Sequence, residues 1–129
     1  MIDSKNFTGI QHIGMPVSDM DKTIRFYEGL GFKVAHQAKT DDGPVTFLKL
    51  GTCVLETWLD PKPPRKAGAI NHISLDVLDI DKAYEEVRAA GYPITTNGVE
   101  ALPFWEKGVR FFTTEGPDCE TVEFCEIIK

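Results

Sequence analysis

The feature that most constrains this sequence is an internal repeat. Residues 10–34, "IQHIGMPVSDMDKTIRFYEGLGFKV", align without a gap with residues 70–94, "INHISLDVLDIDKAYEEVRAAGYPI", after a shift of 60 positions. Eight of the 25 aligned positions are identical, whereas chance gives roughly one or two. The identities are Ile10/Ile70, His12/His72, Ile13/Ile73, Val17/Val77, Asp19/Asp79, Asp21/Asp81, Lys22/Lys82 and Gly31/Gly91. A duplicated unit of this length favours a fold made of two similar halves.

Each copy predicts a strand followed by a helix. In "HIGMPV" and "HISLDV" every second residue is apolar, so one face of each strand packs on a core while the histidine points the other way. Asp19 and Asp79 stand where a helix N-cap belongs. Gly31 and Gly91 supply the residue that ends a helix.

Three extended segments follow each helix. They are expected at 32–39, 44–50 and 52–59 in the first copy and at 92–96, 108–115 and 120–127 in the second. The sequence therefore predicts an α+β protein with two tandem βαβββ modules, at residues 8–59 and 69–128. Residues 60–68, "DPKPPRKAG", are a proline-rich linker between them.

Composition limits the partners and the compartment. A chain of 129 residues with a formal net charge of -6 repels nucleic acids and anionic membranes unless its basic residues cluster, and here they are scattered. No apolar run approaches the ~20 residues of a membrane span, and the opening residues "MIDSKNF" lack the charged start and apolar stretch that are typical of a signal peptide. Cys53, Cys119 and Cys125 lack metal-binding spacing. We expect a cytoplasmic protein with three free thiols and no nucleic-acid or membrane partner.

A glutamate also recurs in the last strand of each module. Glu56 lies in "CVLETW" and Glu123 in "TVEFCE", and alternation places both on the strand face that points away from the helix. Each module thus offers one histidine and one glutamate on the same side, His12 with Glu56 and His72 with Glu123. If the two sheets curl into a cup, these four side chains converge.

Two imidazoles and two carboxylates suit a divalent ion such as nickel, cobalt, zinc, manganese or ferrous iron. A lone histidine on a strand's polar face is more often hydrogen-bonded than a ligand. Recurrence of the histidine with a carboxylate at equivalent points of both modules favours metal binding. His36 has Thr96 at its equivalent position and is treated as a non-ligand.

Two segments resemble a known family, the vicinal oxygen chelate superfamily, which includes glyoxalase I, methylmalonyl-CoA epimerase, extradiol dioxygenases and the fosfomycin and bleomycin resistance proteins. "HIGMPVSDMDKTIRFYEGLGF" is similar to its opening strand and helix, and "FFTTEGPDCETVEF" to its closing segment. The resemblance covers residues 8–128. It implies one domain in which paired βαβββ modules form a cup-shaped mixed sheet with the helices outside. It also implies that His12, Glu56, His72 and Glu123 are the metal ligands.

This ligand set is similar to that of bacterial glyoxalase I, a lactoylglutathione lyase. The resemblance implies a lyase or isomerase whose metal binds two adjacent substrate oxygens while a carboxylate moves a proton through an enediolate. Glu56 and Glu123 are both candidates for that base, and Glu123 is weakly favoured. Alternatives are an epimerase or an extradiol-type dioxygenase on the same module, or a non-catalytic protein that sequesters a small molecule.

Candidate substrate-binding residues surround this set. Trp58 shares a strand face with Glu56, and Phe104 and Trp105 lie in the long loop "LPFWEKG". Lys49 and Arg110, together with Lys107, are candidate anchors for an anion, and Cys125 shares a face with Glu123. The chain lacks the arginine and asparagine that contact glutathione in glyoxalase I, so the substrate class stays open. The resemblance further implies a homodimer, with the site formed in one chain or shared by two.

Overall fold

The chain forms two compact units of similar architecture. The computed structural model describes residues 3–6, 10, 12–68 and 71–129. Unit 1 spans Met1–Pro63 and unit 2 spans Pro64–Lys129, so the boundary falls inside the expected linker. The residues at which the modules are expected to begin, 8 and 69, lie outside the described residues.

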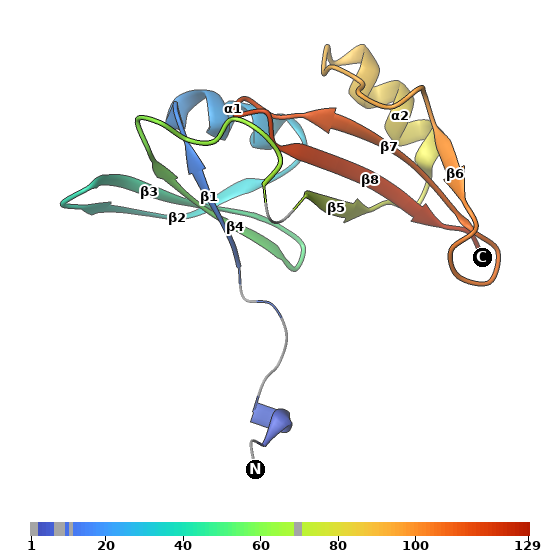
Figure 1. Cartoon of the computed structure of the whole chain (residues 1–129), viewed down its shortest axis with the longest axis horizontal. Helices are drawn as coiled ribbons and strands as arrows, with labels where there is room; N and C mark the ends of the chain where they lie inside the picture. The colour runs from blue at the N-terminus through green and yellow to red at the C-terminus, as the bar shows by residue number, and fades with distance from the viewer. Residues whose placement is uncertain (1–2, 7–9, 11, 69–70) are drawn as a thin grey trace. The chain divides into compact units, whose positions relative to one another are not determined.

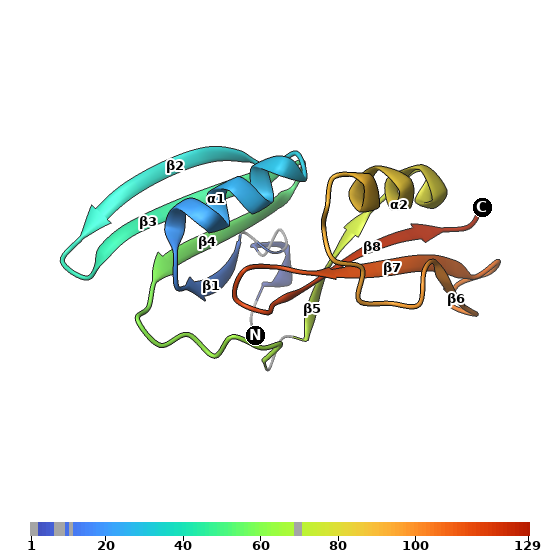
Figure 2. The ribbon, with the colours of Figure 1, turned by 90° about the horizontal axis from the view of Figure 1, so that it is seen from above.

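Unit 1 is a four-stranded mixed sheet with one helix packed against it (Figures 1 and 2). Its elements are a 3-10 turn at Ser4–Asn6, β1 (Ile13–Val17), α1 (Met20–Gly29), β2 (Lys33–Thr40), β3 (Gly43–Leu50) and β4 (Cys53–Leu59). The strands lie in the order β1-β4-β3-β2. Strand β4 is parallel to β1, which requires the crossover through α1, and the other neighbours are antiparallel.

Unit 2 repeats this arrangement. Its elements are β5 (His72–Asp76), α2 (Ile80–Ala89), β6 (Glu100–Leu102), β7 (Val109–Glu115) and β8 (Thr121–Ile127). The strands lie in the order β5-β8-β7-β6, with β8 parallel to β5. The predicted α+β class is confirmed as two four-stranded mixed sheets with one helix each.

The repeated helix signals have the predicted roles. Asp19 and Asp79 cap their helices, since each carboxylate accepts a hydrogen bond from the backbone N–H three residues later, at 3.0 and 3.1 Å. Directly after the C-cap of each helix stands a glycine with positive φ, 102° at Gly31 and 89° at Gly91. In each case the next residue donates its N–H to the carbonyl five residues earlier, as in a Schellman motif.

The cores lie between each helix and one face of its sheet. The buried side chains of unit 1 are Val17, Thr23, Tyr27, Phe32, Thr46, Leu48, Leu55 and Thr57. Those of unit 2 are Leu75, Ile80, Val87, Val109, Phe112, Thr114, Asp118, Val122 and Phe124. We call the opposite sheet face in each unit the helix-free face, because α1 and α2 pack on the other one.

One predicted strand is wrong. Residues 92–96 form only an isolated bridge between Ile94 and Thr114, and the outer strand of unit 2 is β6, inside the segment expected to be a loop. Pro93 has no N–H to give to a strand ladder, and its carbonyl instead accepts a hydrogen bond from the Thr114 hydroxyl at 2.6 Å.

Neither described helix has the length and apolar character needed to cross a membrane. The three cysteines are free thiols, as predicted.

Candidate metal centre

In unit 1, His12 and Glu56 approach each other on the helix-free face. His12 directly precedes β1, and the parallel register sets Gly14 of β1 opposite Glu56 of β4. His12 Nε2 lies 3.7 Å from Glu56 Oε1, with 35% and 31% of the two side chains exposed. The ring of Trp58 lies over Gly14, because a Cβ at this position would be 3.1 Å from Trp58 Cζ3 and 3.7 Å from Glu56 Oε1.

Unit 2 reproduces this pair. His72 is the first residue of β5, and Ser74 stands opposite Glu123 of β8. His72 Nε2 lies 3.8 Å from Glu123 Oε2, with 43% and 18% of the side chains exposed. His72 Nδ1 lies 2.9 Å from the side-chain oxygen of Asn71. Because an amide oxygen only accepts, Nδ1 donates this bond, and this bond orients the ring with Nε2 directed toward Glu123.

The two separations fit a pair of ligands better than a hydrogen bond. Distances of 3.7 and 3.8 Å exceed the N–H···O limit. Two atoms bound to one ion at about 2.0–2.2 Å each lie roughly 3.0–3.5 Å apart at tetrahedral or octahedral angles. Each pair therefore needs movements of only a few tenths of an ångström to hold a cation.

Each pair supplies two donors. Within the described residues, no group of three or more His, Cys, Asp or Glu side chains is arranged to hold a metal ion. The four predicted ligands thus occur as two equivalent pairs, one in each unit.

Aromatic rings surround the pair of unit 1. Phe47 of β3 stands opposite Glu56, and its ring meets that of His12 edge to face at a centroid distance of 5.9 Å. His36 lies on the other side of Phe47, at 6.0 Å. Phe47 was not singled out from the sequence, although alternation in "PVTFLKL" combined with the β3–β4 register identifies it.

A hollow of about 280 Å³ adjoins Glu56. It extends toward the β2–β3 turn, and we call it the Trp58 hollow. Its lining residues are Thr40, Asp42, Gly43, Pro44, Val45, Glu56, Trp58 and Leu59. Trp58 therefore lies beside Glu56, as its strand position predicts.

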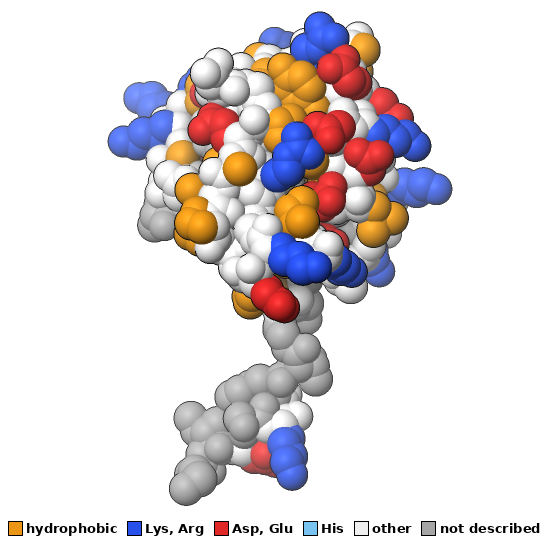
Figure 3. All heavy atoms as spheres, turned by 90° about the vertical axis from the view of Figure 1, so that its right-hand side faces the viewer, with side chains coloured by type: hydrophobic (Ala, Val, Ile, Leu, Met, Phe, Trp, Pro, Cys, Tyr) orange, Lys and Arg blue, Asp and Glu red, His pale blue; other side chains and the backbone are white. Residues whose placement is uncertain are grey.

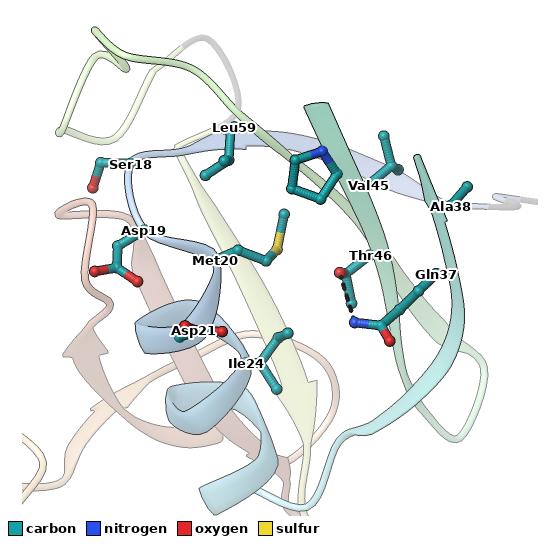
Figure 4. A pocket seen from close by; sticks show the side chains of 11 residues that line it. Ser18, Asp19, Met20, Asp21, Ile24, Gln37, Ala38, Val45, Thr46 and Leu59 are labelled. Atoms are coloured by element: carbon teal, nitrogen blue, oxygen red, sulfur yellow. Dashed lines mark hydrogen bonds between the residues drawn. The ribbon is translucent and has the colours of Figure 1, made fainter. Parts of the chain in front are cut away.

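A second hollow, of about 500 Å³, lies at the N-terminal end of α1 (Figure 4). Met20 and Ile24 point into it from the helix, and Gln37 and Thr46 from the sheet. The Gln37 amide donates a hydrogen bond to the Thr46 hydroxyl at 3.4 Å. This hollow is not lined by Glu56 or Trp58, and Pro44, Val45 and Leu59 line both hollows.

The residues opposite and two positions after the glutamate are not aromatic in unit 2. Thr113 of β7 stands opposite Glu123, where unit 1 has Phe47. Cys125 is at the position equivalent to Trp58, two residues after the glutamate. Burial, and then the carboxylates of Glu123 and Asp76, raise the pKa of the Cys125 thiol. Cys125 is therefore a protonated neighbour of Glu123 at neutral pH.

The other predicted substrate-binding residues of this group lie on the helix-free face of unit 1 or in the loop between β6 and β7. Lys49 pairs with Val54, two positions from Glu56, and lies exposed on the helix-free face. Phe104 and Trp105 are 55% and 72% exposed in the loop between β6 and β7, with Lys107. Within the described residues, no hydrogen bond or ion pair joins any of these four residues to a histidine–glutamate pair.

Arg110 is positioned away from the pair of unit 2. Its guanidinium donates two hydrogen bonds of 2.8 Å to the carboxylate of Asp81 on α2, which places Arg110 on the helix side of the sheet. This pairing lowers the pKa of Asp81 and raises the pKa of Arg110. As an anchor for an anion beside Glu123, Arg110 does not fit, because alternation along β7 sends its side chain to the other face.

Charges on the molecular surface are interspersed. Figure 3 shows acidic and basic side chains mixed on one face of the molecule, without a cluster of one sign. On α2 they form pairs, such as Glu85 with Arg88 at 2.7 Å.

Comparison with known proteins finds relatives along most of the chain. Residues 9–119 match the Glyoxalase/Bleomycin resistance protein/Dioxygenase superfamily. The chain is 29% identical over 128 residues to the uncharacterized protein YwbC of Bacillus subtilis (strain 168), which covers 89% of this chain and 94% of YwbC.

Solved structures share the fold. The glyoxalase family protein from Enterococcus faecalis has a TM-score of 0.78 at 22% identity, with 94% of this chain and 99% of that one covered. TnmS3, an antibiotic binding protein from Streptomyces sp. CB03234, has a TM-score of 0.76 at 21% identity, with 95% and 98% covered.

Proposed function

Since the chain belongs to the Glyoxalase/Bleomycin resistance protein/Dioxygenase superfamily, we propose that it is a metal-dependent lyase or isomerase of the glyoxalase I type. The observation that carries this proposal is the recurrence of one histidine–glutamate pair in both units, at 3.7 and 3.8 Å. A protein that only sequesters a small molecule has no use for two equivalent pairs of metal-ligating side chains.

In this proposal residues 8–59 and 69–128, joined by the linker 60–68, act as one domain. His12 and Glu56 supply half of a four-ligand site, and His72 and Glu123 supply the other half. The two pairs come together in one chain or across a homodimer. Nitrogen and carboxylate donors without thiolates favour nickel, cobalt or zinc, with manganese or iron as further candidates.

When bound, the metal supplies Lewis-acid polarisation of two neighbouring substrate oxygens. The imidazoles of His12 and His72 would be its nitrogen ligands. The Asn71 side chain keeps the ring of His72 oriented through its bond to Nδ1.

Glu123 is the proposed base, with Glu56 as the alternative. Its Oε2 is the oxygen next to His72, at 3.8 Å, so Oε1 is the atom that takes a proton from one substrate carbon and returns it to the next. Glu123 is also the less exposed of the two glutamates, at 18% against 31%.

The test is proton exchange by metal-loaded protein in D₂O. Protein loaded with nickel, cobalt or zinc is mixed with hemithioacetals of several thiols, with acyl-CoA thioesters and with catechols. Glyoxalase-type chemistry predicts product formation from a hemithioacetal that requires the metal and stops in Glu123→Gln. Deuterium entry into an acyl-CoA without thiol dependence indicates an epimerase, and oxygen uptake with catechol and iron indicates a dioxygenase; either result overturns the lyase assignment.

A second candidate function is sequestration of a small molecule in the cytoplasm. Two observations favour it: the Trp58 hollow beside Glu56, and the fold that the chain shares with TnmS3, an antibiotic binding protein. This function predicts ligand binding that is independent of metal and no turnover of any substrate in the screen.

A further inference from the structure

We propose that the Trp58 hollow binds a planar group that is neutral or positively charged, and that it excludes anionic groups. The inference deepens the proposed function and rests on it, because the bound group belongs to the substrate of that site. The hollow, of about 280 Å³, is large enough for a single aromatic ring and borders Glu56 directly.

Gly14 allows the Trp58 ring to lie across β1. A Cβ at position 14 would stand 3.1 and 3.3 Å from Trp58 Cζ3 and Cη2, and 3.7 Å from Glu56 Oε1. The indole therefore occupies the space that a side chain on β1 would fill, next to the glutamate carboxylate. An indole face in this position favours a flat partner by stacking, and a flat cation more strongly.

The charge of the lining selects against anions. Two carboxylates, Asp42 and Glu56, are among the lining residues of the hollow, and in the described part of unit 1 no lysine or arginine is. The whole chain carries a net charge of -6, so the long-range field acts in the same direction. In the metal-free protein, a carboxylate or phosphate that enters this hollow meets the carboxylates of Asp42 and Glu56 and no lysine or arginine of the lining.

The rim of the hollow is held by the β2–β3 turn. The Thr40 hydroxyl accepts a hydrogen bond from the Asp42 N–H at 3.2 Å and donates one to the Gly43 carbonyl at 3.1 Å. Gly43 has a φ of 117°, a conformation that favours glycine. This turn fixes the backbone of Asp42, whose carboxylate lines the hollow.

Unit 2 has no counterpart of the glycine and tryptophan that form this part of unit 1. Ser74 takes the position of Gly14 opposite the glutamate, and Cys125 takes that of Trp58. The planar group is therefore assigned to unit 1 alone, whereas the histidine–glutamate pair belongs to both units.

The experiment uses three planar probes of equal size: benzamidine (cation), benzamide (neutral) and benzoate (anion). Binding to the full chain, freed of metal with EDTA, is measured by calorimetry and by the indole N–H resonance of Trp58. We expect benzamidine and benzamide to shift that resonance, and benzoate to bind at least about tenfold more weakly than benzamidine. Equal affinity for benzoate and benzamidine, or an unchanged Trp58 resonance, overturns the proposal.

Variants sharpen the test. Trp58→Ala abolishes binding of all three probes, Trp58→Phe weakens it, and Gly14→Ala weakens it by displacing the indole. Asp42→Asn narrows the difference between benzamidine and benzoate while benzamide binding is kept. Asp41→Asn, in the same turn but outside the lining of the hollow, is the matched control for Asp42→Asn and leaves binding unchanged; loss of binding in this variant places the probes elsewhere and overturns the assignment.

A separate zinc titration of the wild-type chain distinguishes the two proposals. Probe binding without zinc binding contradicts the metal-dependent function and leaves the hollow as a binding site. Zinc binding without probe binding contradicts only the assignment of the hollow and leaves the metal-dependent function unaffected.

Discussion

The two units share a skeleton and a histidine–glutamate pair, but they differ in what surrounds the pair. In unit 1, Phe47 and Trp58 place aromatic rings beside Glu56. In unit 2, Thr113 and Cys125 take the equivalent positions beside Glu123. Both units retain the elements that hold the pair, and in the proposed function the side chains that differ are those that flank the substrate. Duplication followed by divergence of the flanking residues explains this pattern.

The cores of the two units also differ, but at two equivalent sheet positions the aromatic side chains are in unit 2 and the polar ones are in unit 1. Unit 1 buries Thr46 and Thr57 between helix and sheet, and the Thr57 hydroxyl donates to the Thr46 carbonyl at 2.8 Å. Unit 2 buries Phe112 and Phe124 at the equivalent positions, with stacked rings 4.6 Å apart. A hydrogen-bonded threonine pair and an aromatic pair therefore solve the same packing problem in two ways.

The largest effect on activity is expected when each of the two glutamates is replaced, one at a time, by glutamine. If Glu123 is the base, Glu123→Gln lowers kcat at saturating metal by about 10²–10⁴-fold. Glu56→Gln acts mainly by weakening metal binding and recovers more activity when metal is raised. Steady-state kinetics over a metal titration separates the two variants. A Glu123→Gln enzyme with full kcat at saturating metal would transfer the role to Glu56.

The cores can be compared by one substitution in each unit. Phe112→Ala leaves a cavity against Phe124 and Tyr84 and is expected to lower the free energy of unfolding by about 3–5 kcal/mol. Thr57→Val removes one buried hydrogen bond and is expected to cost about 1 kcal/mol. Urea denaturation measures both values. Equal losses would contradict the difference between an aromatic and a hydrogen-bonded core.

The helix caps should respond alike, because their geometry is the same in both units. Asp19→Ala and Asp79→Ala each remove one hydrogen bond to a helix N-terminus, and each is expected to cost about 1 kcal/mol. Thermal unfolding followed by circular dichroism compares them, with Asp19→Asn and Asp79→Asn as controls that keep a capping oxygen. A large loss in one unit only would show that the two helices are not equivalent.

The smallest effect is expected at the surface of unit 2. The hydrogen bonds from the Arg110 guanidinium lower the pKa of Asp81 in the folded state. The charged pair therefore stabilises the fold at pH values above the ordinary carboxyl pKa, which is about 4. This stabilisation is lost as the pH falls through the lowered pKa of the folded state. Asp81→Asn should therefore be less stable than wild type at pH 7 and equally stable near pH 2. A stability difference that is constant with pH would contradict a role for the Asp81 charge.

The repeat made much of the fold readable from the sequence. Asp19, Asp79, Gly31 and Gly91 act through contacts a few residues away along the chain, so their roles follow from local spacing. The histidine–glutamate pairing was also accessible, because two parallel strands at equivalent places in both modules bring the same residue types together.

Features that depend on register were less accessible. The outer strand of unit 2 was misplaced, because three residues, Glu100–Leu102, give too short a pattern to recognise and Pro93 blocks the expected strand. The pairing of Arg110, a candidate anion anchor, with Asp81 was not accessible from the sequence, since the two residues lie 29 positions apart along the chain. Asp42 was overlooked, because its place at the Trp58 hollow is set by how the β2–β3 hairpin turns.

The central claim is that the two histidine–glutamate pairs work as one site. The most direct measurement is the number of nickel or zinc ions bound per chain in wild type, His12→Ala and His72→Ala, determined by calorimetry and elemental analysis. The account predicts one ion per chain in wild type and none at the same metal concentration in either folded variant. Two ions per chain, or a variant that keeps its ion, would contradict it, because each pair would then act alone or not at all.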